Sequence, residues 1–214
     1  MWDANPAMTP LDPNQKLSKE MSPKTTAERS EMERIPYRQA LGSAMFACQG
    51  TRPDIACTIT TLSCFSNDPG KPHWTALKRV YRYLKGTIHY KLEYSRDGNS
   101  NLIGYSDADW ADDTDNRRST TGDFILQGGA ITWNSKRQRS VALSTNEAEY
   151  MAVSATAQEA IWLRHLLKEI KEELVEEPTV IYTDYQSAIK SAKNSAYRAR
   201  LKHVDTRVHF IREK

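Results

Sequence analysis

The chain has 214 residues, of which 39% are hydrophobic and 27% charged, and its formal net charge is +3. This composition is that of a rather polar folded protein and excludes an intrinsically disordered one. No apolar run approaches the roughly 20 residues that span a bilayer, and the first 36 residues contain no apolar signal-peptide segment. The three cysteines form no C-x-x-C pair, which argues against a disulfide framework or a zinc site and fits a reducing compartment.

Basic residues concentrate in the middle of the chain. Residues 37–96 carry nine Lys or Arg side chains and three Asp or Glu side chains. This segment is therefore the candidate contact for a polyanion, and the alternative is an ordinary solvated helix face.

The first half of the chain predicts a helical module. Residues 1–36 contain five prolines among polar residues, which indicates a linker or a peripheral segment. Between 37 and 86, apolar residues recur at three- and four-residue spacing and predict three helices, with a break at 51–54. We therefore expect a small basic helical module over 37–96.

The apolar period changes to two after residue 87. Strands are predicted at 88–94 and 102–107, followed by a hairpin of 124–126 with 130–133. A long helix is predicted from 145 to 174, then a strand at 179–184 with a helix after it, and a further helical pattern from 203. This order predicts a mixed sheet with helices packed on it over 97–214.

Two aspartates stand at the ends of predicted strands. Asp107 ends an apolar strand, where burial of a carboxylate without a partner is costly. Asp184 ends the strand 179–184, and ligands of open α/β sheets gather at the carboxyl ends of strands. For Asp184 the alternative is a helix N-cap.

Two glutamates near the start of the long helix compete for a functional role. Ser144 and Glu147 have the spacing of a capping box, which gives Glu147 a local role. Residues two apart on a helix point about 200° apart. Glu149, beside Ala148, is therefore the candidate for a site between helix and sheet.

Asp205 follows a basic stretch and is uninformative by itself. The order D-E-D-D of Asp107, Glu149, Asp184 and Asp205 is what gives the set meaning. Several shared carboxylates can hold two divalent metal ions roughly 4 Å apart for phosphodiester cleavage, and oxygen ligands favour Mg²⁺. The histidines show no H-E-x-x-H spacing, and no phosphate-binding G-x-x-x-x-G-K-[ST] loop occurs.

Nine motifs carry a family resemblance. Six of them closely resemble the ribonuclease H (RNase H) domain of copia-type LTR retrotransposon Pol polyproteins: Y-S-D-A-D-W-A (105–111), R-R-S-T-T-G (117–122), I-T-W-N-S-K-R-Q (131–138), L-S-T-N-E-A-E-Y (143–150), Y-T-D-Y-Q-S-A (182–188) and K-H-V-D-T-R-V-H-F-I-R-E (202–213). Three others are similar to the region that joins the reverse transcriptase to that domain: Y-R-Q-A-L-G-S (37–43), T-R-P-D-I-A (51–56) and H-W-T-A-L-K-R-V-Y-R-Y-L-K-G-T (73–87).

This resemblance implies an α/β, RNase H-like fold with a mixed five-stranded sheet and flanking helices, preceded by a small helical module. It implies Mg²⁺-dependent cleavage of the RNA strand of RNA–DNA hybrids by two ions, for which Mn²⁺ can substitute. The implied catalytic and metal-binding residues are Asp107, Glu149, Asp184 and Asp205. The implied partners are the hybrid and the rest of the reverse transcriptase polyprotein, in the cytoplasm or a virus-like particle and not at a membrane.

Basic residues predict the nucleic-acid contacts. Lys136, Arg137 and Arg139 lie just before the long helix, and Lys78 and Arg82 on the third predicted helix extend the track. For each of them the alternative is a solubilising surface charge.

The sequence also departs from the family pattern. No Y-x-D-D polymerase motif occurs, so we expect no DNA synthesis, and the chain is expected to be truncated at its C-terminus. For His203 and His209 the alternatives are assistance in product release and an ordinary structural position. The competing functions are an inactive RNase H-like binding module and a recombinase, whose usual D-D-E order this chain does not follow.

Overall fold

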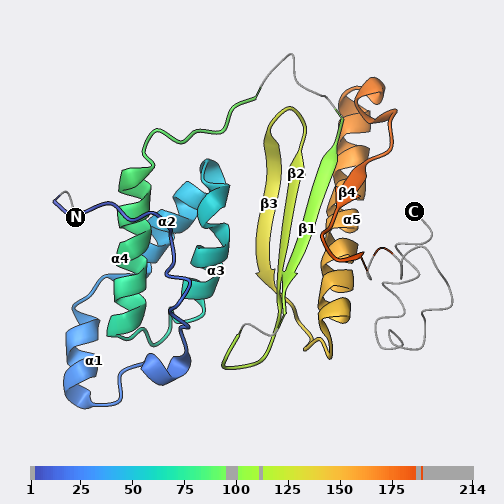
Figure 1. Cartoon of the computed structure of the whole chain (residues 1–214). Helices are drawn as coiled ribbons and strands as arrows, with labels where there is room; N and C mark the ends of the chain where they lie inside the picture. Colours follow the sequence, from blue (N-terminus) through green and yellow to red (C-terminus); the bar gives the residue numbers. More distant parts are fainter. Residues whose placement is uncertain (1–2, 95–100, 111–112, 187–188, 190–214) are drawn as a thin grey trace. The chain divides into compact units, whose positions relative to one another are not determined.

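The computed structural model describes residues 3–94, 101–110, 113–186 and 189. The chain divides into two compact units (Figure 1). The first unit is Met1–Leu92 with Asp113–Asp115, and the second is Glu93–Asp112 with Asn116–Lys214. The domain roles assigned above to 1–36, 37–96 and 97–214 remain predictions.

The first unit is helical, and the three helices predicted between 37 and 86 are confirmed. Pro53 stands at the first position of a 3₁₀ turn, where its missing N–H costs nothing and its fixed φ favours a new helical start. The elements are η1 (Lys19–Met21), α1 (Thr26–Glu33), α2 (Tyr37–Gly50), η2 (Pro53–Ile55), α3 (Ala56–Ser63) and α4 (Lys71–Gly86).

One apolar core holds these helices together. Leu41 of α2, Leu62 of α3 and Val80 of α4 are buried in it, as the helical spacing predicts. The first 36 residues also contribute to the core, because Ala7 and Leu17 are buried there.

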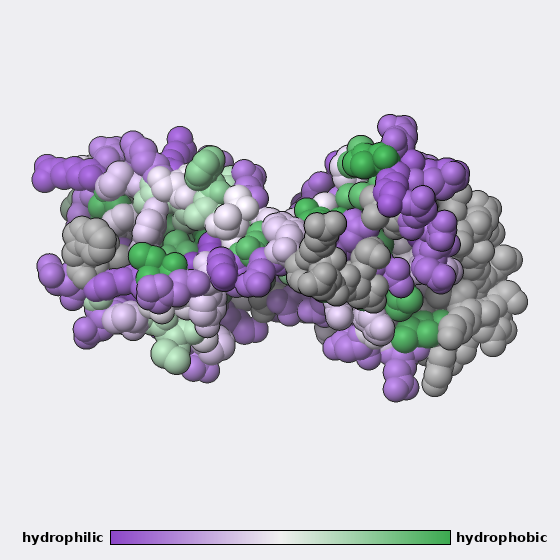
Figure 2. Space-filling model, turned by 90° about the horizontal axis from the view of Figure 1, so that it is seen from above, coloured by the Kyte–Doolittle hydropathy of each residue, from purple (hydrophilic) through white to green (hydrophobic). Residues whose placement is uncertain are grey.

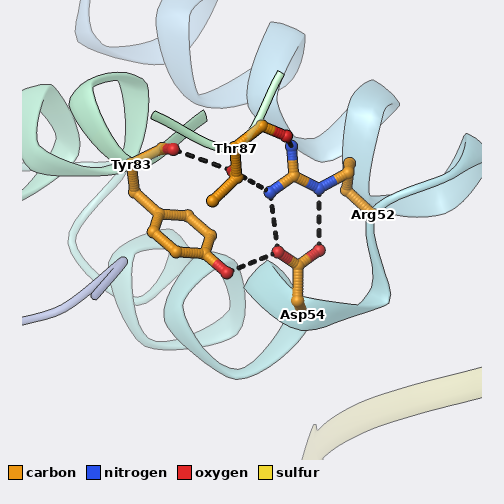
Figure 3. A network of polar contacts seen from close by, with 4 residues as sticks. All are labelled: Arg52, Asp54, Tyr83 and Thr87. Carbon is orange, nitrogen blue, oxygen red and sulfur yellow. Dashed lines mark hydrogen bonds and ion pairs between the residues drawn. The ribbon is translucent and has the colours of Figure 1, made fainter. Parts of the chain in front are cut away.

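A partly buried polar network joins the end of α4 to the turn before α3 (Figure 3). The Arg52 guanidinium donates to both carboxylate oxygens of Asp54, from Nε at 2.9 Å and from Nη2 at 2.7 Å. Tyr83 Oη donates to Asp54 at 2.8 Å, and Arg52 Nη1 donates to the Thr87 carbonyl at 3.3 Å. The network therefore fixes the C-terminal end of α4, from which the chain leaves the first unit.

The second unit contains a four-stranded mixed sheet with one long helix on it. Its elements are β1 (Ile103–Asp109), β2 (Thr120–Leu126), β3 (Ala130–Arg137), α5 (Thr145–Ile170), η3 (Glu172–Val175) and β4 (Val180–Tyr182). The sheet order is β3-β2-β1-β4. The pairs β1–β2 and β2–β3 are antiparallel, whereas β4 runs parallel to β1.

Individual residues explain two of the turns in this unit, the turn between β2 and β3 and the turn before β4. The β2–β3 hairpin turns at Gly128, whose φ of 67° favours glycine, and the predicted hairpin of 124–126 with 130–133 is confirmed. Before β4, Arg164 of α5 donates to the carbonyls of Glu177 at 2.7 Å and Val175 at 2.6 Å. These bonds hold the turn that leads into β4.

Helix α5 packs on one face of the sheet, against β1 and β2 (Figure 1). Gly104 of β1 permits this close approach, because a Cβ atom there would lie 3.2 Å from Thr156 Cγ2 and 3.3 Å from Ile181 Cγ1. Nearer its start, α5 meets β1 through small side chains, and Ala108, Ala148 and Ala152 form a buried cluster with Ala142.

Two predictions about the sheet need correction. Residues 88–94 are not a strand, and the sheet of the described residues has four strands instead of the predicted five. Alternation is not sufficient for a strand, which also needs a pairing partner and a buried face. Ile88 and Tyr90 are 68% and 63% exposed, and the Tyr90 ring lies locally under the Arg52 guanidinium, 5.6 Å from its carbon.

The surface in Figure 2 is mostly hydrophilic, with separate hydrophobic patches on both units. Large apolar side chains with high exposure include Met8, Phe46, Leu143 and Ile170. In the part of the chain that the structure describes, no helix combines the length and the apolar character that crossing a bilayer requires.

The network of Figure 3 predicts a large effect of Arg52→Met on stability. Removing the guanidinium takes two hydrogen bonds from Asp54, whose side chain is 30% exposed and keeps Tyr83 as a donor. The free energy of unfolding should therefore fall by about 1–3 kcal/mol. The matched control is Lys71→Met, which removes an exposed ion pair to Glu31 and should cost less than about 0.5 kcal/mol. Urea denaturation followed by circular dichroism measures both, and equal effects would contradict the assigned role.

Candidate metal centre

The register of two parallel strands brings two predicted acids together. In the β1–β4 pair, Tyr105 lies opposite Tyr182, and their rings stack with centroids 5.4 Å apart. Asp107 and Asp184 each follow two residues later. Both therefore stand at the same end of neighbouring strands, as predicted for the carboxyl edge of the sheet.

Glu149 joins them from the helix. Oxygen atoms of Asp107, Glu149 and Asp184 all lie within 4.8 Å of one another. Glu149 is 4% exposed, whereas the two aspartates are exposed. The group is thus anchored from beneath by a buried carboxylate and open to solvent on the side of the strands.

The start of α5 explains why Glu149, and not Glu147, takes this place. Ser144 Oγ accepts a hydrogen bond from Glu147 N at 3.2 Å. Glu147 Oε2 in turn accepts from Leu143 N at 2.7 Å, so the side chain closes the helix start one residue earlier than a standard capping box. The predicted local role of Glu147 is confirmed, and Glu149 is left to face the sheet.

The electrostatics of this group disfavour three negative charges. Burial, followed by the charges of Asp107 and Asp184, raises the pKa of Glu149 to about 7, although the Ala108 backbone N–H opposes the shift. Glu149 Oε2 is buried, and no donor for it lies among the described residues.

A divalent cation would suit this set of ligands. Three converging carboxylates and a buried oxygen without a donor are what a hard cation with oxygen ligands satisfies. The three residues could therefore hold a metal ion, and the chemistry open to them is metal-assisted attack on a phosphate or a carbonyl.

The other predicted site residues are not brought into this group. Asp205, His203 and His209 lie outside the described residues. Lys136 and Arg137 end β3, and Arg139 follows two residues later. Lys136 and Arg139 are exposed, and Arg137 is half-buried.

The two predicted contacts on α4 already have partners within the first unit. Lys78 Nζ lies 5.9 Å from the centre of the Trp74 ring. Arg82 Nε donates to the Asn5 carbonyl at 2.6 Å. Arg82 therefore has a structural role, in addition to the proposed contact with nucleic acid.

One buried acid of the second unit escaped the sequence interpretation. Asp123 of β2 is 7% exposed. Burial, then the charge of Glu159, raises its pKa to about 6, against a hydrogen bond from Asn134 that lowers it. The alternation of Thr121, Asp123 and Ile125 would have placed it on the buried face, because residues two apart share a face of a strand.

No protein-family model matches the chain. It is 50% identical over 216 aligned residues to the retrovirus-related Pol polyprotein from transposon TNT 1-94 of Nicotiana tabacum, with 100% of this chain and 16% of that protein covered. It is 38% identical to the corresponding polyprotein from transposon RE1 of Arabidopsis thaliana, with 99% of this chain and 14% of that protein covered. The chain thus spans a small part of these polyproteins.

A shorter relative is covered almost completely. The chain is 53% identical over 133 residues to the secreted RxLR effector protein 161 of Plasmopara viticola, which covers 62% of this chain and 94% of that protein. Among solved structures, an RNase H1 isolated from compost is similar at a TM-score of 0.38 and 17% identity, over 53% of this chain and 74% of that one. This last similarity is too weak to assign a fold.

The raised pKa of Asp123 predicts how stability depends on pH. The folded protein holds this proton more tightly than the unfolded chain, whose value is 3.8. The stabilisation is complete below that value and is lost as the pH rises through about 6.

Asp123→Asn removes this loss. Relative to wild type, the variant should gain about 1–3 kcal/mol of unfolding free energy between about pH 4 and about pH 8. Urea denaturation at both pH values measures the gain, with Asp68→Asn at an exposed position as the matched control. The same pH dependence in both variants would refute the assignment.

Proposed function

We propose that this chain, whose homologues include retrovirus-related Pol polyproteins from plant transposons at up to 50% identity, carries a metal-dependent RNase H of the copia type. In this proposal the second unit cleaves the RNA strand of RNA–DNA hybrids. The convergence of Asp107, Glu149 and Asp184 within 4.8 Å is the observation that carries it. The order D-E-D along β1, α5 and β4 is the order that the resemblance implies.

The topology of the second unit supports an RNase H-like fold. Three antiparallel strands come first, then a long helix on one face, and then a strand parallel to β1. This arrangement places the first acid on β1, the third acid two residues after the end of the adjacent β4, and the second acid on the helix between them in sequence. The site therefore draws on every layer of the unit.

The chemistry follows from what each side chain can do. Asp107 and Asp184 are exposed and can face a phosphate that approaches from solvent. Glu149 is buried and must lose its proton to act as a ligand, because metal ligands bind in their deprotonated form. When bound, a pair of Mg²⁺ ions would supply an activated water and neutralise the leaving 3′ oxygen.

Substrate binding in this proposal is mainly electrostatic. Lys136 and Arg137 end β3, and Arg139 follows in the segment before the helix that carries Glu149, so in this proposal they contact the phosphates that flank the scissile bond. Choice of the RNA strand would come from its 2′-hydroxyls and from the shape of the hybrid.

Two parts of the proposal reach beyond the described residues. Asp205 is the fourth carboxylate that the resemblance implies, and its role remains a prediction. The chain spans 16% of the TNT 1-94 polyprotein, so we propose the remaining reverse transcriptase as the partner that presents the hybrid.

Cleavage of a labelled RNA–DNA hybrid in Mg²⁺ tests the activity. Asp107→Asn removes a charged ligand and should lower the rate by at least about 100-fold, and EDTA should abolish cleavage. Glu169→Gln, which removes an exposed carboxylate from the far end of α5, is the control and should retain the rate. Hybrid binding without any cleavage by the wild type would favour the alternative, an inactive binding module.

The salt dependence of hybrid binding tests the basic contacts separately. Each lost phosphate contact lowers the log–log slope by roughly 0.9 on duplex DNA. Lys136→Ala with Arg139→Ala should therefore lower it by roughly 1.8 if the hybrid behaves similarly. Lys168→Ala near the other end of α5 should leave the slope unchanged, and an unchanged slope in the double variant would remove these residues from the interface.

A further inference from the structure

Gln138 is a buried amide at the junction between the sheet and the start of α5. It follows β3 directly and is 6% exposed. Its backbone N–H donates to the Ser119 carbonyl at 2.8 Å, just before β2 begins. This bond prolongs the contact between the two strands by one residue and turns the side chain into the interior.

The side chain bonds to two elements at once. Gln138 Nε2 donates to Thr121 Oγ1 of β2 at 3.0 Å and to the Ala148 carbonyl of α5 at 3.0 Å. The orientation of the amide is fixed, because the Ala148 carbonyl can only accept and must face the nitrogen. Gln138 Oε1 has no partner among the described residues, so the nitrogen makes the contacts that matter.

These two contacts stand next to two of the site acids. Thr121 lies opposite Ala108 in the β1–β2 register, and Ala108 follows Asp107. Ala148 directly precedes Glu149. One amide therefore ties the strand position beside Asp107 to the helical turn that carries Glu149.

The surrounding packing gives this bond its importance. Where the start of α5 meets β1, the buried apolar cluster consists of alanine side chains. Methyl groups allow a close approach but provide little interlocking shape to fix the rotation of the helix. A directional hydrogen bond, worth about 1 kcal/mol net, can fix it.

We propose that Gln138 is a positioning residue of the site, which sets the direction of Glu149 relative to Asp107. This inference rests on the proposed function, because it concerns the geometry of the same carboxylates. Gln138 itself touches neither metal nor substrate. Outer residues that orient metal ligands typically change metal affinity or activity by about 10–100-fold when they are replaced.

Gln138→Met is the central test, because it keeps the length of the side chain and removes both donated bonds. Isothermal titration with Mn²⁺ and steady-state cleavage of the hybrid are measured on the full chain. We expect Mn²⁺ affinity and kcat to fall by about 10-fold or more, with KM for the hybrid within about twofold of wild type. Gln158→Met, on the exposed side of α5, is the matched control and should match wild type in all three.

A second variant removes the acceptor of the bond between Gln138 and Thr121. Thr121→Val removes the accepting hydroxyl at a similar shape. In a double-mutant cycle with Gln138→Met, a positioning role predicts that the losses in Mn²⁺ affinity are not additive. Should Gln138→Met not fold, the affinity and kcat of Thr121→Val decide in its place.

The outcomes separate this inference from the proposed function. Wild-type Mn²⁺ affinity and kcat in a folded Gln138→Met, with cleavage intact in the wild type, would overturn the positioning role alone. A wild type that neither binds Mn²⁺ nor cleaves the hybrid would overturn the proposed function and this inference with it. A fall in thermal stability without any change in Mn²⁺ affinity would show a purely structural role.

Discussion

The fold of the second unit holds three carboxylates close together against their mutual repulsion. Asp107, Glu149 and Asp184 have oxygen atoms within 4.8 Å of one another, and Glu149 is buried. Like charges so close together cannot all ionise at low cost, and the raised pKa of Glu149 records that cost. Holding these carboxylates together lowers the stability of the fold, and binding of a cation would offset that cost.

Backbone geometry imposes this convergence. The parallel register of β1 and β4 sets the two aspartates side by side, and Gly104 lets α5 pack close to the strands. Glu147 closes the start of α5 and thereby leaves the next turn to present Glu149. Asp107 is thus held by a hydrogen-bonded strand and Glu149 by a capped helix, and Asp184 stands two residues beyond the strand that pairs with β1.

The sequence alone could predict the three helices of the first unit, the long helix and the hairpin, because each has a local cause, and it singled out the three acids whose convergence the structure shows. Helical spacing, a Gly-Gly turn and a capping box are all read within a few residues. The strand predicted at 88–94 was wrong because pairing depends on distant residues. The burial of Asp123 could have been predicted from the local alternation of its strand, whereas its raised pKa, which depends on burial and then on Glu159 of α5, could not.

The basic character of the first unit has a partly internal explanation. Three basic side chains of α4 donate to backbone carbonyls near the start of the chain: Arg79 to Thr9, Arg82 to Asn5 and Lys85 to Ala4. An excess of positive charge in a segment therefore does not by itself identify a surface for phosphate. Lys136 and Arg139 of the second unit are the better candidates, because they are exposed and close in sequence to the acids.

The most direct test of the central claim is a crystal of the protein soaked with Mn²⁺ and measured for anomalous scattering. We predict anomalous density between Asp107, Glu149 and Asp184, and its loss in Asp107→Asn. Well-ordered carboxylates in the same arrangement without any anomalous density between them would contradict the claim that these residues form a metal-dependent site.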